Sequence, residues 1–537
     1  MQDPAKNAPF RALVCDAIHE SGLNALKKAG DIDVDLRPGI EPDELLRVIR
    51  QYDALLIRSR TNINAEMIQA ADRLKAIGRA GVGLDNVDIE AATRRGVIVM
   101  NSPGGNTVAA AEHSITMMLA LSRNIAPANA ALLRGEFDAR TRMVGVELYN
   151  KTLGVFGLGR IGIEVAKRAA AFGMRVVGRD PYISDEVASQ QRIHLMPFEE
   201  LIQTADYITI HVPLTRETYH RFGRREFSRM KPTARIINCA RGGVIDEDAL
   251  LEALKEGEIA GAALDVFEDE PNVNMRLAEL PNALTTPHLG GSTREAQEFV
   301  ARDIARQVSA ALRGLPVENA VNMPSLDARA MESVGPYVSL AEKLGSIQAQ
   351  LSRGEKIQEV GIEYAGDIFE GASNLVASSL QKGILSRALA GRVNYVNAPV
   401  LIRQRGIRLL ETRSSGHPVY ANLLTVTVVT SKERRSIGGT VFGNQERIVM
   451  IDQYHTSAMP EGCMLFVYNY DQPGMIGRVG TILGSHDINI SDMSVGRVSP
   501  KGLAVMAVNI DSEAPDEAIR EIAAIERIHE VKYVVLS

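Results

Sequence analysis

The first hundred residues alternate short apolar runs with helical patterns. Apolar runs over 11–16, 53–59 and 74–81 are typical of buried strands, whereas 42–51 and 64–73 show the apolar spacing of helices. Strands separated by helices join as βαβ units, which lay the strands parallel. The pattern therefore predicts a parallel α/β sheet at the start of the chain.

A second alternating series begins at residue 152. Its predicted strands cover 152–157, 174–179, 206–212, 234–240 and 260–267. A helical stretch rich in Ala, Met and Leu lies between the two series, over 105–135. A further helical pattern over 292–313 is expected to cross back and complete the first α/β unit.

The pattern changes after residue 324. Residues 324–460 combine helical patterns with β-rich runs, and the pair Gly438 and Gly439 predicts a turn. From residue 461 the order is strand, helix, strand, strand, helix, strand, which is the ferredoxin-like βαββαβ pattern. A chain of 537 residues is too long for one hydrophobic core, so we expect three or four domains.

Composition and charge narrow the classes of protein. The 45% hydrophobic and 23% charged residues are typical of a soluble globular protein, apolar runs are too short for a membrane span, and the N-terminus lacks the pattern of a secretory signal. A net charge of −6 with dispersed Lys and Arg gives no reason to expect a nucleic-acid partner. Cys15, Cys239 and Cys463 lack metal-ligand spacing, so we expect no metal and a reducing compartment, the cytoplasm.

A glycine motif, GLGRIG, follows the strand predicted over 152–157 and opens a helical pattern. In such a motif Gly157 permits the tight turn, Gly159 lets the backbone approach a pyrophosphate, and Gly162 lets helix and strand pack closely. Asp180 lies 18 residues after Gly162, close to the ~20 expected for an acid that binds a ribose. Asp180 favours NAD over NADP, although the neighbouring Arg179 is a residue type that can pair with the 2′-phosphate of NADP. The alternative interpretation of the motif is a glycine turn that binds no nucleotide.

Three polar residues stand at or just after the ends of predicted strands, where ligands bind in parallel sheets: Arg241, Glu270 and His288. Hydride removal from an alcohol beside a carboxylate needs a base, an anion that orients the base, and a cation for the carboxylate. His288, Glu270 and Arg241 supply these groups in turn. Taken singly, His288 would be a structural histidine and Arg241 a surface ion-pair residue. Cys239 has no accompanying base and is interpreted as a small buried residue.

The motifs GLGRIG, ARGG, DVFxxEP and PHLGGST occur in this order, and with them residues 10–320 resemble the D-2-hydroxyacid dehydrogenase family. The resemblance implies that Arg241 binds the substrate carboxylate and that Glu270 partners the acid/base His288. It also implies cofactor contacts at Gly157, Gly159, Arg160, Ile161, Gly162, Asp180, His211, Val212, Pro213, Thr215, Cys239, Ala240, Asp265, His288, Gly290 and Gly291. A non-catalytic NADH-sensing scaffold of the same fold is the rival from another class.

The N-terminal loops carry the candidate substrate residues. Arg58 and Arg79 fall at strand ends, and with Arg241 they would suit a substrate that has both a carboxylate and a phosphate. Asn101 and Ser102 would add neutral donors. The resemblance implies oxidation of D-3-phosphoglycerate to 3-phosphooxypyruvate, the entry to L-serine biosynthesis. The alternative substrates are glycerate and 2-hydroxyglutarate. The alternative role of Arg58 and Arg79 is to satisfy carbonyl groups at the strand ends.

The remaining segments resemble parts of the long form of this family. Residues 324–460 resemble its intervening domain, and 461–537 resemble an ACT domain, which implies a possible L-serine effector at Asn469, Asp471 and Asn489. The helical stretch 105–135 makes dimer contacts in this family, so we expect a homodimer or homotetramer. Arg134, on that stretch, is a weaker candidate for phosphate contact across a subunit interface.

The predicted fold class is α/β throughout the first two units. A Rossmann-type NAD domain is inserted in a flavodoxin-like α/β substrate domain, followed by an α+β intervening domain and a ferredoxin-like ACT domain. The expected boundaries are 1–104 with 296–323, then 105–295, 324–460 and 461–537.

Overall fold

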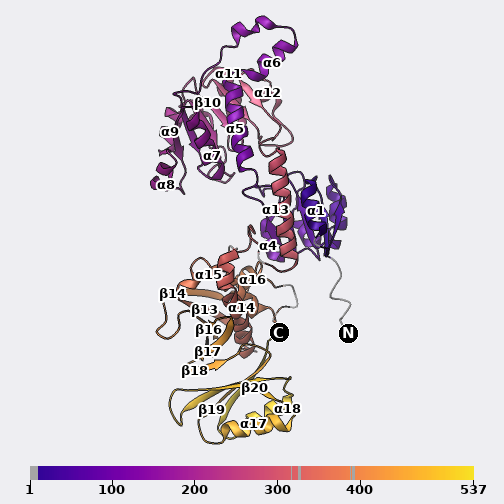
Figure 1. Cartoon of the computed structure of the whole chain (residues 1–537), viewed down its shortest axis with the longest axis vertical. Coiled ribbons are helices and arrows are strands. Elements are labelled where there is room, and N and C mark those ends of the chain that lie inside the picture. Colours follow the sequence, from indigo (N-terminus) through magenta and orange to yellow (C-terminus); the bar gives the residue numbers. More distant parts are fainter. Residues whose placement is uncertain are drawn as a thin grey trace.

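The computed structural model describes residues 10–28, 30–315, 317–324, 328–352, 354–387, 389 and 393–536. Within them four sheets define four units, which follow one another along the long axis of the molecule (Figure 1). The second unit lies at one end, then come the first, third and fourth. The expectation about a signal peptide concerns residues 1–9, which lie outside the described residues.

The first unit is a parallel sheet in the order β2-β1-β3-β4-β5, which is the predicted flavodoxin-like order. Its strands are β1 (Phe10–Val14), β2 (Ile32–Leu36), β3 (Ala54–Ile57), β4 (Ala76–Arg79) and β5 (Ile98–Met100). The intervening helices are α1 (Glu20–Lys28), α2 (Pro42–Val48), η2 (Ile49–Gln51), α3 (Ala65–Ala70) and α4 (Ile89–Arg95).

Helix α13 (Arg294–Leu312) returns to the first unit after the second is complete, as predicted. It packs on α1 and β4, and the approach is so close that a Cβ on Gly22 would lie 2.6 Å from the carbonyl oxygen of Ala301. Val300, Ile304 and Val308 of α13 are buried against the sheet. The second unit is therefore inserted into the first, and the two are joined by α13 and by the segment before α5.

The second unit is a seven-stranded parallel sheet in the order β12-β11-β10-β9-β6-β7-β8. Its strands are β6 (Thr152–Phe156), β7 (Arg175–Arg179), β8 (His194–Leu195), β9 (Tyr207–Ile210), β10 (Arg235–Asn238), β11 (Gly261–Leu264) and β12 (Ala283–Thr285). Its helices are α5 (Thr107–Ser122), α7 (Arg160–Ala171), α8 (Asp185–Gln190), α9 (Phe198–Thr204), α10 (Arg224–Phe227), α11 (Glu247–Glu256) and α12 (Met275–Ala278). The strand order reverses between β6 and β9, which is where ligands bind in Rossmann-type sheets.

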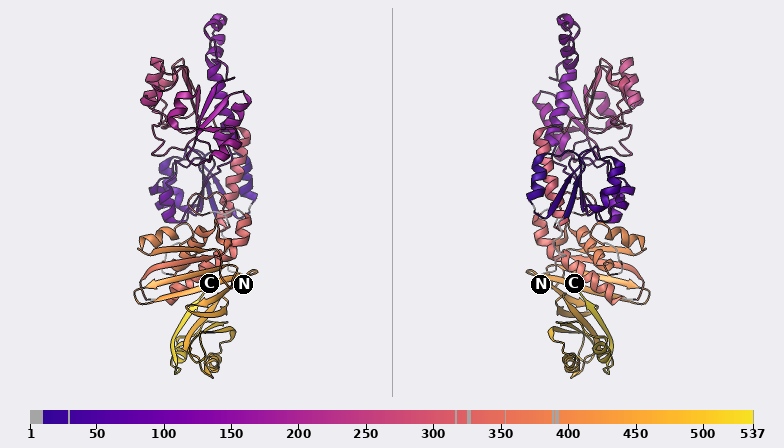
Figure 2. Two further views of the ribbon diagram at one scale, coloured as in Figure 1. Left: turned by 90° about the vertical axis from the view of Figure 1, so that its left-hand side faces the viewer. Right: turned by 90° about the vertical axis from the view of Figure 1, so that its right-hand side faces the viewer.

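The predicted helical stretch 105–135 is divided in two. It forms α5 and α6 (Ile125–Leu133), because Asn124 between them has a left-handed backbone with φ of 53°. Helix α6 and the 3-10 turn η3 (Phe137–Arg142) protrude at the far end of the second unit (Figures 1 and 2). Leu133 and Phe137 on this protrusion are strongly exposed.

The third unit is a mixed sheet in the order β14-β13-β15-β16-β17-β18. It comprises α14 (Ala328–Leu351), β13 (Ile357–Ala365), η4 (Asp367–Phe369), α15 (Ser373–Leu385), α16 (Ala398–Gln404), β14 (Arg408–Ser414), β15 (Leu423–Thr430), β16 (Arg434–Phe442), β17 (Gln445–Ile451) and β18 (Tyr454–Ala458). The turn predicted at Gly438 and Gly439 is wrong, since both lie inside β16 at a register shift. A Cβ on Gly439 would lie 3.1 Å from Leu340 and Leu344 of α14, so this glycine admits the helix rather than a turn.

The fourth unit has the predicted βαββαβ order and the sheet order β20-β21-β19-β22. Its elements are β19 (Cys463–Tyr470), α17 (Met475–Ser485), β20 (Ile490–Arg497), β21 (Leu503–Ile510), α18 (Asp516–Ala523) and β22 (Ile528–Val535). Alternate residues of β19 face opposite ways: Leu465 and Val467 pack under α17 and α18, whereas Met464 and Phe466 join the core of the third unit. Both faces of this sheet are therefore covered.

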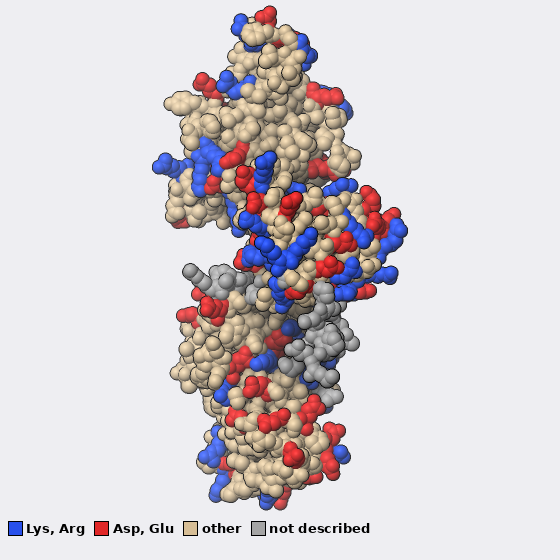
Figure 3. All heavy atoms as spheres, turned by 45° about the vertical axis from the view of Figure 1, so that its right-hand side comes forward, with Lys and Arg blue, Asp and Glu red and all other residues tan. Residues whose placement is uncertain are grey.

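Surface charge differs along the molecule. Lys and Arg side chains gather over the middle of the face shown in Figure 3, where the first unit lies, while Asp and Glu are frequent over the last two units. Among the described residues no helix is long and apolar enough to cross a membrane. Cys15, Cys239 and Cys463 are all free.

Candidate active site

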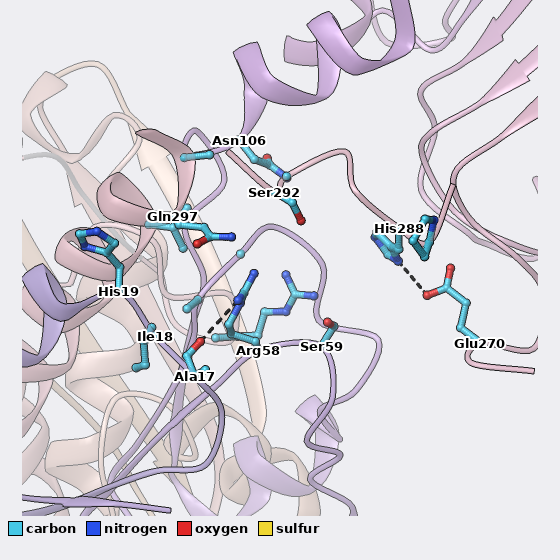
Figure 4. A pocket seen from close by; sticks show the side chains of 17 residues that line it. Ala17, Ile18, His19, Arg58, Ser59, Asn106, Glu270, His288, Ser292 and Gln297 are labelled. Atoms are coloured by element: carbon cyan, nitrogen blue, oxygen red, sulfur yellow. Dashed lines mark hydrogen bonds and ion pairs between the residues drawn. The ribbon is translucent and has the colours of Figure 1, made fainter. Parts of the chain in front are cut away.

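A cavity of about 260 Å³ lies between the first and second units. Figure 4 shows Arg58 on one side of it and the pair His288 and Glu270 on the other. Arg58 and Arg79 reach it from the ends of β3 and β4, and Gln297 reaches it from the first turns of α13. The cavity thus joins the carboxyl edges of both parallel sheets.

His288 and Glu270 form a hydrogen-bonded pair. His288 Nδ1 lies 2.7 Å from Glu270 Oε2, while Glu270 Oε1 accepts a hydrogen bond from the Phe267 amide at 3.0 Å. Burial acts to raise the pKa of Glu270, but the hydrogen bonds from His288 and the Phe267 amide outweigh burial and hold that pKa below its usual range. An ionised Glu270 requires a proton on Nδ1, which leaves Nε2 of a neutral His288 with a free lone pair.

The backbone of His288 is held by one residue, Asp265. His288 has a left-handed backbone with φ of 54°, and its amide donates to the carbonyl oxygen of Asp265 at 2.9 Å. The next two amides, those of Leu289 and Gly290, donate to the Asp265 carboxylate at 2.7 and 2.8 Å. Three successive amides on one aspartate therefore fix a backbone conformation that is uncommon outside glycine.

Arg241 bridges the two units. It follows β10, and its Nε lies 3.1 Å from Asp85 Oδ2 on the first unit. The guanidinium passes close to Gly83, where a Cβ would lie only 2.2 Å from Arg241 Nη2 and would push the end of this side chain aside. Asp85 is largely exposed, so the carboxylate that pairs with Arg241 is one that an incoming ligand can replace.

Arg79 is a half-buried cation whose Nε atom is fully buried. Its Nε makes no hydrogen bond within the described part of the chain. Burial lowers the pKa of Arg79 to about 10, and the nearby Arg241 and Arg58 act in the same direction against the opposing effect of Asp85 and Asp16. Arg58 and Arg79 thus line one small cavity, with the charge of Arg241 close to Arg79, an arrangement that an anion with several oxygens would stabilise.

Asn101 and Ser102 do not face the cavity as predicted. Asn101 Nδ2 donates to the carbonyl oxygen of Val82 at 2.6 Å, and Ser102 Oγ donates to Asp303 at 2.7 Å. Ser102 is completely buried. Asn101 therefore ties the segment after β5 to the loop after β4, and Ser102 ties the same segment to α13, so the geometry does not favour direct donation to a ligand.

The glycine motif adopts the geometry that a dinucleotide requires. Gly157 has φ of 98° and a Cβ there would lie 2.6 Å from the carbonyl oxygen of His211, while a Cβ on Gly162 would lie 2.0 Å from that of Gly157. Around Gly159 there is open space, and the first amides of α7 have no side-chain cap. Asp180 accepts a hydrogen bond from the Leu158 amide at 2.8 Å, so its carboxylate stands beside the motif. These residues fit a pyrophosphate and a ribose.

The other predicted cofactor residues lie in loops along the same edge of the sheet. They are Arg160 and Ile161 at the start of α7, His211, Val212, Pro213 and Thr215 after β9, Cys239 and Ala240 after β10, Asp265 after β11, and Gly290 and Gly291 after β12. Burial lowers the pKa of His211 to about 3, so this ring is neutral and unsuited to be a second base. Burial also raises the pKa of the Cys239 thiol to about 12, which agrees with a non-nucleophilic role.

Four polar residues near the cavity were missed from the sequence. His19, Asn106 and Gln297 line it, and Asn106 Oδ1 is buried without a hydrogen-bond partner among the described residues. His113 lies behind it, against Asp265. Asn106 stands at the start of the helical stretch predicted over 105–135, and an asparagine in that place was a usable signal, whereas nothing local distinguishes the other three.

The predicted effector residues lie in the fourth unit. Asn469 and Asp471 line a cavity of about 440 Å³ beside the start of α17, where Gly474 has φ of 90°. Asp471 pairs with Arg497 at 2.8 Å, and Asn489 donates to Asp511 at 2.7 Å. Arg134, at the end of α6, pairs with Glu136. The structure thus brings Asn469 and Asp471 into one cavity.

Three family descriptions match consecutive parts of the chain. They are the NAD binding domain of D-isomer specific 2-hydroxyacid dehydrogenases over 115–290, the D-3-phosphoglycerate dehydrogenase intervening domain over 333–452, and the ACT domain over 464–527. Among solved structures, a glyoxylate reductase from Paecilomyes thermophila superposes with a TM-score of 0.53 at 30% identity, covering 58% of this chain and 98% of its own. D-lactate dehydrogenase from Aquifex aeolicus, complexed with NAD and lactic acid, gives 0.51 at 27% identity, covering 56% and 96%.

Whole-length relatives are also found. D-3-phosphoglycerate dehydrogenase from Methanocaldococcus jannaschii is 44% identical over 98% of this chain and 100% of its own length. The protein of the same name from Bacillus subtilis is 41% identical over 98% and 100%. The fold and the site define an NAD-dependent enzyme of the D-isomer specific 2-hydroxyacid dehydrogenase class. Within this class, the identity along nearly the whole chain places the protein in the D-3-phosphoglycerate dehydrogenase family.

Proposed function

We propose that this chain oxidises D-3-phosphoglycerate to 3-phosphooxypyruvate with NAD, the first step of L-serine biosynthesis. The observation that carries the proposal is the buried Nε of Arg79, which has no hydrogen-bond partner among the described residues. Arg79 and Arg58 share one cavity with His288, and the charge of Arg241 lies close to Arg79. A substrate with a carboxylate and a phosphate supplies the anionic oxygens that this cluster lacks. Relatives that bear the name of this activity match along the whole chain.

In this proposal the residues of the chain divide the work of the reaction. Bound NAD supplies the acceptor for a hydride from C2. His288 takes the hydroxyl proton at Nε2, while Glu270 holds Nδ1 and stabilises the imidazolium that results. Arg241 gives up its ion pair with Asp85 and binds the substrate carboxylate instead, while Arg58 and Arg79 bind the phosphate.

The proposal also assigns the residues that bind NAD and the bounds of the domains. The first amides of α7 bind the pyrophosphate, Asp180 binds the ribose, and the remaining predicted loop residues line the cofactor cleft. The substrate-binding domain covers 1–104 and 296–323, and the NAD-binding domain, which also supplies Arg241 and His288, covers 105–295. The intervening and ACT domains cover 324–460 and 461–537. The free cysteines suit a reducing compartment, for which the cytoplasm is our assignment.

Regulation and assembly form the finer part of the proposal. L-Serine is the proposed effector, bound at the cavity that Asn469 and Asp471 line, with Asn489 of the same unit as the third candidate residue. The exposed apolar residues of α6 and η3, including Leu133 and Phe137, are suited to a contact between two copies of this chain in a homodimer or homotetramer.

The decisive experiment follows NADH fluorescence as the purified protein reduces 3-phosphooxypyruvate, with and without millimolar L-serine. The chain has no Trp, so no tryptophan emission overlaps the signal. His288→Ala is expected to lower kcat at least ~100-fold while NADH still binds, because a general acid–base group contributes ~10²–10⁴-fold. Near-normal turnover in this variant would remove His288 from its role.

The same assay separates the alternatives. Turnover of 2-ketoglutarate or hydroxypyruvate without turnover of 3-phosphooxypyruvate would refute the phosphate-binding role of Arg58 and Arg79. Absence of turnover with every 2-keto acid would point to the NADH-sensing scaffold. Turnover that serine does not change would keep the enzyme and discard the effector.

A further inference from the structure

A half-buried histidine outside the predicted site contacts the aspartate that holds the His288 turn. His113 lies on α5, and its Nε2 is 3.1 Å from Asp265 Oδ1 and 3.2 Å from Thr286 Oγ1. Thr286 Oγ1 itself donates to the same Asp265 oxygen at 2.5 Å. His113, Asp265 and Thr286 therefore form one triangle, made by α5 and by the ends of β11 and β12.

We propose that His113 is a positioning residue for hydride transfer: its Nε2–H holds the Asp265 carboxylate and the Thr286 hydroxyl, and through them the turn that carries His288. This inference rests on the acid/base role proposed for His288. His113 touches neither substrate nor the reacting atoms in this arrangement. It acts through Asp265, which receives the amides of residues 288, 289 and 290.

The burial of Asp265 explains why a fourth donor is needed. The Asp265 side chain is completely inaccessible to water, and an ionised carboxylate in such a place is stable only when donors surround it. Thr286 and the amides of Leu289 and Gly290 supply three hydrogen bonds, and all three come from the segment that Asp265 must hold. His113 supplies a donor from a separate element, so it fixes the carboxylate relative to the sheet.

The pKa of Asp265 agrees with this account. Burial acts to raise it, but the hydrogen bond from His113, followed by those from Thr286 and the Leu289 amide, holds the pKa below its usual range. Asp265 can only accept hydrogen bonds in this state, so Nε2 of His113 carries the proton that both oxygens share. Loss of that proton donor leaves a buried carboxylate one partner short.

A shift of the 286–290 turn would move the imidazole of His288 and leave the arginine cluster in place. Arg58 and Arg79 lie on the first unit, and Arg241 follows β10, so none of them is carried by that turn. Misplacement of a reacting group by about 1 Å costs on the order of 10²-fold in rate. The expected signature is a loss in kcat with little change in the KM for the keto acid.

The test compares two substitutions at one position in the full-length enzyme. His113→Leu removes the donor at similar volume and is expected to lower kcat about 10–100-fold, with KM for 3-phosphooxypyruvate within about threefold of the parent. His113→Gln keeps an N–H donor and is expected to remain within about fivefold of the parent. The isotope effect on kcat with deuterated NADH should increase in the leucine variant, because hydride transfer becomes slower than product release.

Matched variants guard against a general disturbance of the helix. Glu112 is the exposed neighbour of His113 in the sequence and pairs with Arg168. Glu112→Gln should leave kcat unchanged. Thr286→Val removes the second corner of the triangle and should reproduce the kcat-specific loss, which keeps the test decisive if His113→Leu fails to fold.

Three results would overturn the inference: a kcat for His113→Leu within twofold of the parent, equal losses in the leucine and glutamine variants, or a rise in KM as large as the fall in kcat. Failure of the proposed function is distinguishable, since it appears in the parent enzyme as absence of turnover with 3-phosphooxypyruvate. If the parent reduces another 2-keto acid instead, the same comparison is made with that substrate.

Discussion

Arg79 is half-buried and Arg435 is buried, and the charges around these two arginines are opposite. Arg79 faces a cavity among Arg58 and Arg241, its Nε has no hydrogen-bond partner in the described chain, and burial lowers its pKa to about 10. Arg435, on β16, lies between two carboxylates, that of Glu433, 2.8 Å from its Nε, and that of Glu530 on β22. Its Nε, like that of Arg79, meets no hydrogen-bond geometry among the described residues, so the two arginines differ in counter-charge.

The pKa of Arg435 is correspondingly raised. Burial acts to lower it, but the carboxylates of Glu433 and Glu530 outweigh burial. Around Arg435 the protein supplies its own counter-charge and gains a link between the third and fourth units. Around Arg79 the described residues form no ion pair with its guanidinium, and an anionic substrate would supply the missing negative charge. The identity of the residue is therefore less informative than whether the fold completes its partners.

The largest effect is expected at the junction of the third and fourth units. Arg435→Gln should destabilise the protein by about 3 kcal/mol, because Glu433 loses its counter-charge and Glu530 is left with Lys532. This is the lower end for a broken buried ion pair, since Glu433 and Glu530 keep about a third of their side-chain surface exposed, at 32% and 34%. Urea unfolding followed by tyrosine fluorescence measures the loss. An unchanged midpoint, or a variant with reduced kcat at normal stability, would contradict the structural role.

The same variant has a defined pH dependence. Burial acts to raise the pKa of Glu530, but Arg435 and Lys532 lower it overall. A carboxylate with a depressed pKa in the folded state stabilises the fold above its unfolded pKa of ~4.3 and loses that contribution as the pH falls through the folded value. The stability difference between parent and variant should be constant at neutral pH and shrink below about pH 4. A difference that stays constant into acid would rule out this pair as its source.

A smaller effect, in a different quantity, is expected in the cleft. Arg79→Gln should raise KM for 3-phosphooxypyruvate about 100-fold, or about 2.7 kcal/mol, the scale of hydrogen bonds to charged groups. The thermal midpoint should not fall, since the variant removes a half-buried cation that lacks a counter-ion. Arg60→Gln, at an exposed arginine beside the same loop, is the control and should change KM less than twofold. A lower thermal midpoint with unchanged KM would make Arg79 structural.

The smallest effect is expected at the carboxylate that pairs with Arg241. Asp85→Asn should lower KM about two- to threefold, because exposed ion pairs contribute ~0.2–1 kcal/mol and the substrate no longer competes with Asp85. Steady-state kinetics at low ionic strength make the change measurable, and added salt should diminish it. An increase in KM would mean that Asp85 orients Arg241 rather than blocking it.

Much of the fold follows from local periodicity. The strand predicted over 152–157 is β6 at Thr152–Phe156, and the return of α13 follows from its amphipathic pattern. The paired glycines in β16 were misassigned to a turn because sequence pattern cannot tell a glycine that bends the chain from one that admits a helix. The break at Asn124 was missed because an asparagine in the left-handed region leaves no mark on the apolar spacing.

The site residues also differ in whether a local sequence pattern reveals them. Arg241, Glu270 and His288 were predicted because each stands in a motif after a strand, and the structure brings Glu270 and His288 together. Ser102 was misplaced because a hydroxyl in a loop gives no indication of its direction. His113 was missed because its partner Asp265 is distant in sequence and the contact arises only when α5 packs on the sheet.

One face of the sheet in the fourth unit packs into the hydrophobic core of the third unit, and this limits where the chain can be cut into fragments. Met464 and Phe466 belong to the same core as Ile347 and Leu351 of α14, so the family boundary near residue 461 is not a boundary between independent hydrophobic cores. A fragment that began at residue 461 would expose that apolar face to water and aggregate, whereas one comprising residues 328–536 keeps the shared core whole. Exchange of effector modules between relatives therefore has to carry both units together.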